Sequence, residues 1–161
     1  MSERIAVSSA ERVRAALAAL AIECEVRSYP ASTRTAAEAA AAIGCDVAQI
    51  VKSLVFRAAS GRPVLALVSG SNRVDERRLA AAIGQAVGRA DADFVRRTTG
   101  FAIGGVAPLG HLEPPIAIVD RDLTALGEIW AAAGTPNSVF RLTPEELRRA
   151  SGGRVADIKA D

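Results

Sequence analysis

The fold is decided by the stretch Val51-Lys52-Ser53-Leu54-Val55-Phe56-Arg57, whose β-branched and aromatic residues predict a strand. The residues Ser60-Gly61-Arg62-Pro63 predict a turn after this strand, and residues 64–69 form a second apolar run. Two such runs separated by a short Gly- and Pro-containing turn are typical of a β-hairpin. We therefore expect residues 51–57 and 64–69 to pair.

Two helices and one strand are expected before this hairpin. The capping box Ser8-Ser9-Ala10-Glu11 predicts a helix over residues 9–21, and residues 24–29 alternate as a strand does. A second capping box, Thr35-Ala36-Ala37-Glu38, predicts a helix that ends at Gly44. Asp46 and Gln49 can cap one more short turn.

Short helices and strands alternate after the hairpin. Asp75 and Asp91 each can cap a short helix, with a strand around Val87 between them. Residues 101–115 are rich in glycine and proline and predict a long loop. Strands are expected at 116–120, 128–133, 138–142 and 154–158, with a helix from Pro144 to about residue 150. This order predicts an α+β fold with a mixed sheet.

Length and composition limit the function classes. A chain of 161 residues is expected to form one domain over residues 1–161. It has no apolar run of the roughly 20 residues that a membrane helix needs, and Met1-Ser2-Glu3-Arg4 does not begin a secretory signal, so we expect a cytoplasmic protein. Two separated cysteines suggest neither a disulfide framework nor a zinc cluster. A net charge of +2 is too small to indicate nucleic-acid binding by itself.

Lys52 is the most informative single residue, because it lies in an apolar strand where a charge is costly unless it is paired or used. The alternative is that strand alternation points Lys52 to solvent. Leu54 and Phe56 share its face, which weakens that alternative. The residue pattern alone leaves both interpretations open.

Gly104-Gly105-Val106-Ala107-Pro108 could bring backbone N–H groups close to an acyl oxygen, although a simple turn is the commoner meaning of Gly-Gly. The chain has neither a phosphate-binding loop nor a dinucleotide-binding fingerprint. His111 is the only histidine, so a metal site of several imidazoles is excluded. A hydrogen bond that stabilises the loop, or a place in a pocket wall, suits His111 better than a general base. Asp120 and Asp122 are interpreted as turn residues without a catalytic role.

Taken together, several segments resemble the YbaK and aminoacyl-tRNA synthetase-associated family. They are residues 35–44, 51–56, Arg73-Val74-Asp75 with Leu79, Gly104 to His111, and Ile118-Val119-Asp120. The resemblance covers residues 31–158. It implies a mixed, highly curved β-sheet or barrel surrounded by helices, and a deacylase that hydrolyses mischarged aminoacyl-tRNA. The substrate implied is tRNA(Pro) carrying alanine, cysteine or another small amino acid.

The resemblance also implies the site residues. Lys52 matches the essential lysine, which contacts the terminal adenosine phosphate or other polar groups of the substrate, and Gly104 offers its backbone to the developing oxyanion. The expected substrate-binding residues are Ser53, Gly105, Val106, Ala107, Pro108, His111, Asn137 and Ser138. Some relatives have an acidic residue where this chain has Val139. An activated ester with a helping ribose hydroxyl needs no metal or organic cofactor, so none is expected.

The implied partners are the acceptor end of tRNA and, as a candidate, prolyl-tRNA synthetase; neither a membrane nor DNA is expected. Two alternatives remain at this point. The first is a non-catalytic tRNA-binding or synthetase-associated regulatory module with the same fold. The second is an editing enzyme whose amino acid is free or differently carried, which a test of tRNA dependence distinguishes.

Overall fold

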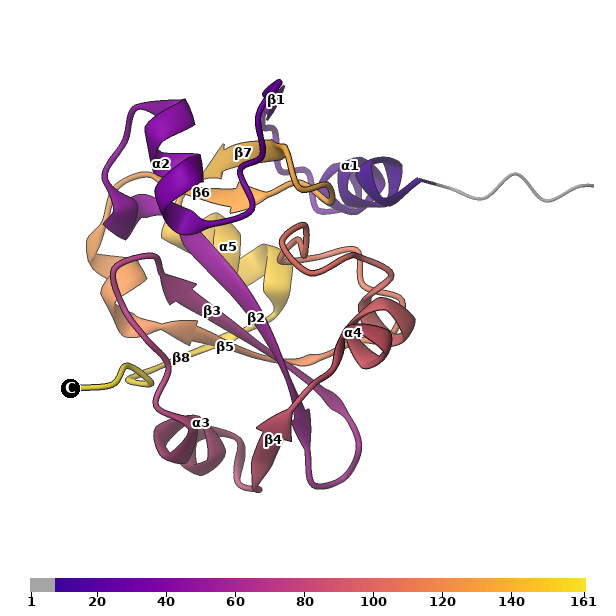
Figure 1. Ribbon diagram of the computed structural model, residues 1–161, viewed down its shortest axis with the longest axis vertical. Coiled ribbons are helices and arrows are strands. Elements are labelled where there is room, and N and C mark those ends of the chain that lie inside the picture. Colours follow the sequence, from indigo (N-terminus) through magenta and orange to yellow (C-terminus); the bar gives the residue numbers. More distant parts are fainter. Residues whose placement is uncertain (1–7) are drawn as a thin grey trace, which may run out of the picture.

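The computed structural model describes residues 8–161 and consists of two β-sheets with helices around them (Figure 1). The expectation about a secretory signal concerns residues 1–4, which lie outside the described residues. The five α-helices formed by residues 8–161 are α1 Ser9–Ala19, α2 Ala36–Ile43, α3 Glu76–Ile83, α4 Ala92–Thr99 and α5 Pro144–Ser151. None of these helices has the length and apolar character that crossing a lipid bilayer requires.

The helices begin at the caps that the sequence predicts. The hydroxyl of Ser8 accepts a hydrogen bond from the Glu11 N–H at 3.2 Å, and the hydroxyl of Thr35 accepts one from the Glu38 N–H at 3.1 Å. Such bonds satisfy N–H groups that the first helical turn leaves without partners. Glycines in the left-handed conformation end four of the described helices, α2 to α5.

The larger sheet contains the predicted hairpin. Its strand order is β4-β2-β3-β5-β8. The strands are β2 Val51–Ala58, β3 Pro63–Ser69, β4 Val87–Arg89, β5 Ile116–Asp120 and β8 Arg154–Ala156. β2 pairs antiparallel with β3 and β4, whereas β5 pairs parallel with β3 and β8, which confirms a mixed sheet.

The smaller sheet has the order β1-β7-β6, with β1 Val26–Ser28, β6 Ile129–Ala132 and β7 Ser138–Leu142. A single bridge between Ile50 and Trp130 connects it to the start of β2. The mixed α+β class is confirmed; the resemblance implied a highly curved sheet or a barrel, and the pairing of the described residues gives two sheets and no closed barrel.

Two connections are 3-10 helices, η1 Val47–Gln49 and η2 Arg121–Ala125. The sequence predicts η1 through Asp46 and Gln49, and the Gln49 side chain accepts a hydrogen bond from the Asp46 N–H at 3.0 Å. It does not predict η2. The expected strand over residues 154–158 and the helix over residues 9–21 each end two residues early, as element ends commonly do.

The free edge of β2 positions the site. Gly70 N–H donates to Ile50 O, and Ala58 N–H donates to Arg62 O, so the even-numbered residues of β2 bond to β3. Residues 51, 53 and 55 therefore direct their backbone groups to the opposite edge. β4 covers that edge only beside residues 56–58. At the start of the same edge, Ile50 is bridged to Trp130 of β6, so the stretch between this bridge and residue 56 has no paired strand.

Candidate active site

Lys52 and Gly104 line the same cavity, at the free edge of β2. The cavity has a volume of about 320 Å³. Four parts of the chain form its wall: the start of α2, β2, the glycine loop and β6. The lining residues are Arg34, Thr35, Ala36, Ile50, Val51, Lys52, Ser53, Leu54, Ile103, Gly104, Val106 and Ala132.

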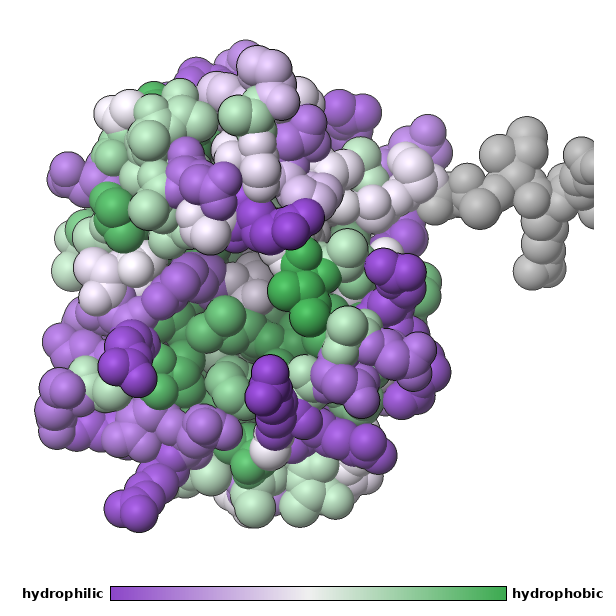
Figure 2. Space-filling model, in the orientation of Figure 1, coloured by the Kyte–Doolittle hydropathy of each residue, from purple (hydrophilic) through white to green (hydrophobic). Residues whose placement is uncertain are grey.

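A second, apolar hollow of about 210 Å³ adjoins this cavity. The two share five lining residues, which are Ser53, Leu54, Ile103, Gly104 and Val106. The remaining wall of the hollow comes from Val55, Phe56, Ala90 and Val95. Figure 2 shows a hydrophobic depression over β2 with hydrophilic residues around it. Polar Lys52 thus lies at one end of a continuous groove whose other end is apolar.

The side chain of Lys52 is half-buried, and its Nζ donates a hydrogen bond to the main-chain oxygen of Asn72. Burial lowers the pKa of Lys52 because it disfavours the charged form, and Arg73 lowers it further, while Asp120 acts in the opposite direction. The alternative that Lys52 simply points into solvent does not fit this environment. Its ammonium has a fixed partner on one side and the cavity on the other.

The glycine loop approaches its neighbours too closely for a side chain. Gly104 has φ +91°, and a Cβ there would come within 2.2 Å of the Arg34 Cγ. A Cβ on Gly105 would lie 2.9 Å from the carbonyl carbon of Thr135. Gly105 N–H donates to Ala102 O at 2.9 Å, whereas no acceptor within residues 8–161 is found for the Gly104 N–H. Gly104 is therefore placed beside the cavity with an N–H that a ligand could use.

The other loop residues divide into two groups. Val106 lines the cavity together with Gly104. Gly105, Ala107 and Pro108 are buried and do not line it. The structure therefore places these three predicted substrate-binding residues behind the cavity wall, where they support the part of the loop that carries Gly104.

Ser53 lines both the Lys52 cavity and the apolar hollow, and its hydroxyl is buried there. Its side chain lies on the strand face opposite that of Lys52, because successive side chains alternate. Its Oγ is buried and has no hydrogen-bond partner among residues 8–161. An unpaired buried hydroxyl costs free energy, and such a group next to a cavity can be satisfied by a ligand.

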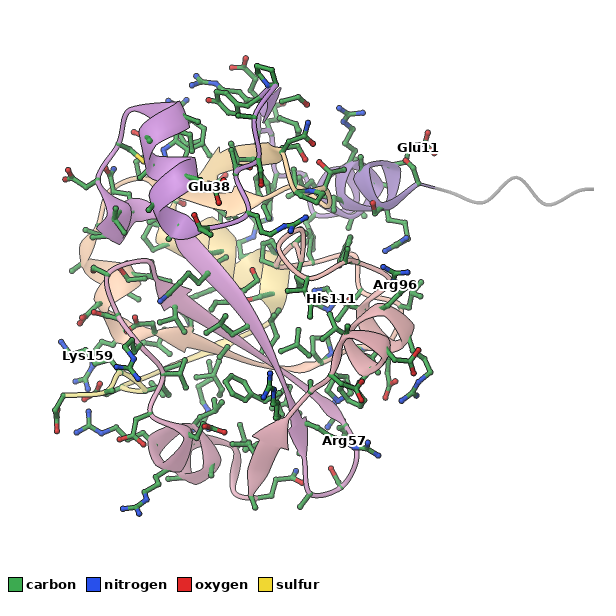
Figure 3. All side chains as sticks on the ribbon, viewed as in Figure 1. Glu11, Glu38, Arg57, Arg96, His111 and Lys159 are labelled. Atoms are coloured by element: carbon green, nitrogen blue, oxygen red, sulfur yellow. The ribbon has the colours of Figure 1, made fainter. Side chains whose placement is uncertain are left out.

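His111 lies on the far side of the glycine loop, near α4 (Figure 3). Its Nε2 is 2.6 Å from Ala107 O, and its ring packs edge-on against Phe101 with 5.3 Å between centroids. Burial lowers the pKa of His111, and the nearby charge of Arg12 lowers it too. His111 does not line the cavity of Lys52, so its contacts are those of a residue that stabilises the loop.

Asn137 and Ser138 belong to the turn that backs onto Gly105. Asn137 Nδ2 donates to Tyr29 O at 3.0 Å, and the Ser138 hydroxyl pairs with that of Thr135. Neither residue lines the cavity that contains Lys52. The buried Val139 packs near Trp130 and provides no carboxylate.

Sequence reasoning missed several residues of the site. Arg34, Thr35 and Ile103 line the cavity, but nothing in their local sequence distinguishes them from surface residues. Asn72 accepts the hydrogen bond of Lys52 through its main-chain oxygen, and Asp120 bonds to the side chain of Asn72. The signal for Asp120 is present in the sequence, because a carboxylate that directly follows four apolar strand residues is expected to be buried.

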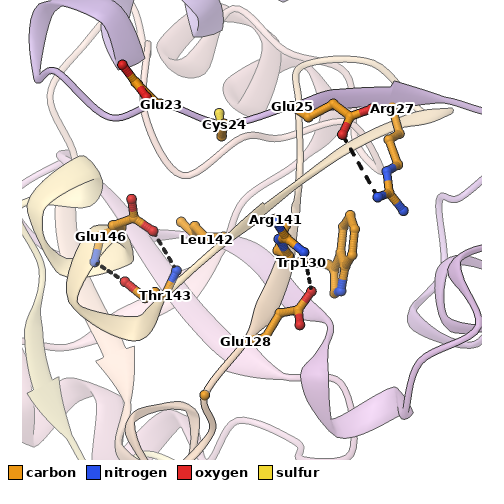
Figure 4. A pocket seen from close by; sticks show the side chains of 11 residues that line it. Glu23, Cys24, Glu25, Arg27, Glu128, Trp130, Arg141, Leu142, Thr143 and Glu146 are labelled. Carbon is orange, nitrogen blue, oxygen red and sulfur yellow. Dashed lines mark hydrogen bonds and ion pairs between the residues drawn. The ribbon is translucent and has the colours of Figure 1, made fainter.

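A separate cavity of about 350 Å³ lies beside the smaller sheet, where four glutamates face two arginines (Figure 4). Arg141 forms an ion pair with Glu128 at 3.4 Å, and Arg27 lies over the Trp130 ring at 4.9 Å. Arg27 also pairs with Glu25 at 4.0 Å, and Glu146 accepts a hydrogen bond from the Thr143 N–H at 2.8 Å. Within residues 8–161 no group of three or more His, Cys, Asp or Glu side chains could hold a metal ion.

Comparison with known proteins identifies the family. Residues 30–150 match the sequence profile of the aminoacyl-tRNA editing domain. The chain belongs to this family. This confirms the predicted resemblance, and with it the prediction that the protein is a deacylase that edits mischarged aminoacyl-tRNA.

Individual relatives agree with this membership. The protein YwhH of Bacillus subtilis, which is uncharacterized, is 31% identical over 83% of this chain and 85% of its own. EbsC of Enterococcus faecalis, named as a candidate Cys-tRNA(Pro)/Cys-tRNA(Cys) deacylase, is 26% identical over 77% and 76%. A crystal structure described as a candidate trans-editing enzyme for prolyl-tRNA synthetase is 47% identical, covers 98% of this chain and 100% of its own, and superimposes with a TM-score of 0.90.

Proposed function

We propose that this editing domain acts in trans on tRNA(Pro) that carries a small wrong amino acid, and hydrolyses the ester with help from the substrate itself. The observation that carries the proposal is that Lys52 and Gly104 line one cavity at the free edge of β2. The names of the relatives EbsC and the prolyl-tRNA trans-editing enzyme support the choice of tRNA(Pro).

Gly104 suits the reacting carbonyl. Water adds to the ester carbon and the carbonyl oxygen becomes an oxyanion. When the carbonyl forms again, the bond to the ribose oxygen breaks, and that oxygen takes the proton lost by the water, which releases the amino acid and the tRNA. A free backbone N–H that points at the developing oxyanion stabilises this transition state. The Gly104 N–H has no acceptor among residues 8–161, and its positive φ is compatible with such a role.

Lys52 suits the phosphate or another polar group of the terminal adenosine. Its ammonium is partly removed from water, so it loses less hydration when it binds an anion. No carboxylate lines this cavity, and the imidazole of His111 lies elsewhere. We therefore assign the activation of water to the ribose hydroxyl next to the ester, which the substrate provides.

The size of the cavity favours a small amino acid. Ala36 and Ala132 form part of its wall, and the whole volume of about 320 Å³ must also accept part of the ribose. One methylene changes discrimination by about 1 to 3 kcal/mol. Ser53 and Val106, which line the cavity, are proposed to contact the substrate. The residues behind the wall are proposed to fix its shape; they are Gly105, Ala107, Pro108, Asn137 and Ser138.

Arginines near the groove support an RNA partner. Arg34 lines the cavity, and Arg73 lies close enough to influence Lys52. Arg57 follows Phe56, which lines the apolar hollow, and both Arg57 and Arg97 lie over the Phe94 ring, at 5.2 and 5.5 Å. Binding of tRNA through such groups should weaken steeply with salt. A tRNA substrate implies action in the cytoplasm, and prolyl-tRNA synthetase is proposed as the partner that supplies it.

The experiment is a deacylation assay with Ala-tRNA(Pro), Cys-tRNA(Pro) and Pro-tRNA(Pro), and with free aminoacyl esters as a test of tRNA dependence. We expect hydrolysis of one mischarged tRNA and sparing of Pro-tRNA(Pro). Lys52→Ala should reduce kcat/KM about 100-fold or more, equivalent to about 2.7 kcal/mol. Binding of all three tRNAs without hydrolysis would instead support a non-catalytic tRNA-binding module.

A further inference from the structure

The ammonium of Lys52 is held by a loop whose own position is fixed from behind. Lys52 Nζ donates to the main-chain oxygen of Asn72, in the loop that follows β3. The side chain of Asn72 is half-buried and turns away from Lys52 towards the end of β5. The place of the Lys52 ammonium therefore depends on what holds Asn72.

Two carboxylates hold the Asn72 side chain. Its Nδ2 donates to Asp120 Oδ2 at 2.8 Å and to Asp122 Oδ2 at 2.9 Å. Both hydrogens of the amide are thus used, which fixes the orientation of the side chain. Because hydrogen bonds to ionised acceptors are stronger than neutral ones, this contact is an effective clamp on the loop.

Asp120 anchors this arrangement in the core. Its side chain is 1% exposed, and its carboxylate also accepts hydrogen bonds from the Ser69 N–H at 3.1 Å and the Asp122 N–H at 3.0 Å. Ser69 ends β3 and Asp120 ends β5, so one carboxylate joins the ends of two paired strands to the Asn72 loop. A buried charge with this many donors has a defined position.

We propose that Asn72 and Asp120 are positioning residues. They hold the ammonium of Lys52 beside the place that the terminal phosphate of the tRNA occupies when it is bound. The proposal rests on the proposed deacylase function. A displacement of about 1 Å of a positioned group can cost about 100-fold in rate. Neither residue lines the cavity, so both act through Lys52 and not on the substrate.

The charged groups around Lys52 make the proposal measurable. Asp120 raises the pKa of Lys52, in opposition to burial and to Arg73. Asp122 lies beyond Asn72 and pairs with Lys159 at 3.0 Å, and this contact raises the pKa of Lys159. Arg34 is a further charge that lines the cavity. Asp120 also raises the pKa of Lys159, whereas Asp122 is not among the charges that act on Lys52. A fall in the pKa of Lys52 should therefore follow removal of the Asp120 charge and not removal of the Asp122 charge.

The experiment uses the fact that Lys52 and Lys159 are the only lysines of the chain. Lysine labelled with ¹³C at Cε gives two NMR signals, whose titration is followed in the full chain without substrate. In Asp120→Asn, the pKa of Lys52 should fall. In the matched control Asp122→Asn, the pKa of Lys159 should fall while that of Lys52 holds. An unchanged Lys52 pKa in Asp120→Asn would overturn the proposal.

Activity provides the second measurement, which also covers the case that Asp120→Asn folds poorly. Asn72→Ala should lower kcat at least tenfold with little change in KM, whereas Gln85→Ala, whose side chain bonds only to the distant Ser60 N–H, should behave as wild type. Wild-type kcat in Asn72→Ala would overturn the positioning role. If the wild-type protein hydrolyses no ester, the proposed function fails, and the substrate-free titrations still decide what holds Lys52.

Discussion

The side chain of Arg34 lies directly against Gly104, so closely that a Cβ on the glycine would meet the Arg34 Cγ at 2.2 Å. Arg34 precedes α2, and Gly104 lies in the loop after α4. This contact closes one side of the cavity that contains Lys52. The glycine is therefore required both by its positive φ and by its neighbour.

Gly104→Ala should abolish most of the activity. The new Cβ must displace Arg34 or change the backbone of the loop, and either response moves the N–H assigned to the oxyanion. Loss of one such donor costs about 100- to 1,000-fold in kcat. Single-turnover deacylation of the mischarged tRNA measures this effect directly.

Gly61→Ala is the matched control for this variant. Gly61 has φ +90° in the hairpin turn, and a Cβ there meets no atom within 4 Å. Both variants should lose about 1 kcal/mol of stability because of the positive φ, and Gly104→Ala should lose more because its Cβ also meets Arg34. Only Gly104→Ala should lose activity. Equal deacylation rates in the two variants would contradict the role of the Gly104 N–H.

Arg34→Ala should weaken tRNA binding more than it slows the chemistry. Arg34 is exposed at the rim of the cavity, where a guanidinium can contact a phosphate. We expect KM to rise about tenfold. The slope of log KM against log salt should decrease by the amount that corresponds to the loss of about one phosphate contact. Arg148→Ala, an exposed arginine on α5, is the control. A salt slope equal to that of wild type would remove Arg34 from the RNA interface.

The sequence predicts most of this fold because its signals are local. Caps at the helix ends act within a few residues of the chain, so they work wherever a helix is placed in the fold. Examples are the hydroxyls of Ser8, Thr35 and Thr143, which accept hydrogen bonds from backbone N–H groups of the first turn. The 3-10 helix η2 was not predicted, since its polar and apolar residues show no clear periodicity. The separation into two sheets could not be predicted either, because strand pairing depends on contacts distant in sequence.

The sequence predicts those site residues that belong to a family motif and also stand out locally, as a lysine in an apolar strand or a glycine in a tight loop does. Lys52 and Gly104 belong to this class, and the structure brings them together. Arg34 and Asn72 could not be found from the sequence. Each acts through a contact with a residue far along the chain, such as the contact between Asn72 and Asp120. Local propensity carries no information about these pairs.

Ser53→Ala should stabilise the free protein and impair the enzyme. The Ser53 Oγ is buried without a partner among residues 8–161, and removal of such a hydroxyl should raise the free energy of unfolding by about 1 kcal/mol. If this hydroxyl bonds to the substrate, kcat/KM should fall about fivefold, the equivalent of one neutral hydrogen bond. Urea denaturation and deacylation kinetics measure the two effects.

Ser69→Ala is the comparison for Ser53. The Ser69 hydroxyl is also buried but donates to Ala48 O at 2.7 Å, so its removal should lower stability by about 1 kcal/mol. Opposite signs of the two stability changes are expected. If Ser53→Ala destabilises the protein as Ser69→Ala does, the Ser53 hydroxyl has a partner in solution and is not reserved for substrate.

His111 should make the protein less stable as the pH falls below neutrality. Burial lowers its pKa below the ordinary value of 6.5, so between that value and the lowered pKa the unfolded chain binds more protons than the folded chain. The free energy of unfolding therefore rises with pH across this window and decreases as pH falls through it. His111 is the only histidine, and ordinary carboxylates titrate mainly at lower pH.

His111→Gln should remove this dependence. A glutamine can still donate to Ala107 O, but it does not titrate, so the stability of the variant should be nearly flat from pH 7.5 to 5.5. Thermal unfolding at constant ionic strength measures both proteins. Since His111 holds the loop but does not line the Lys52 cavity, the variant should retain deacylase activity within a few-fold at pH 7.5. A large loss of kcat with unchanged stability would instead place His111 in the catalytic machinery.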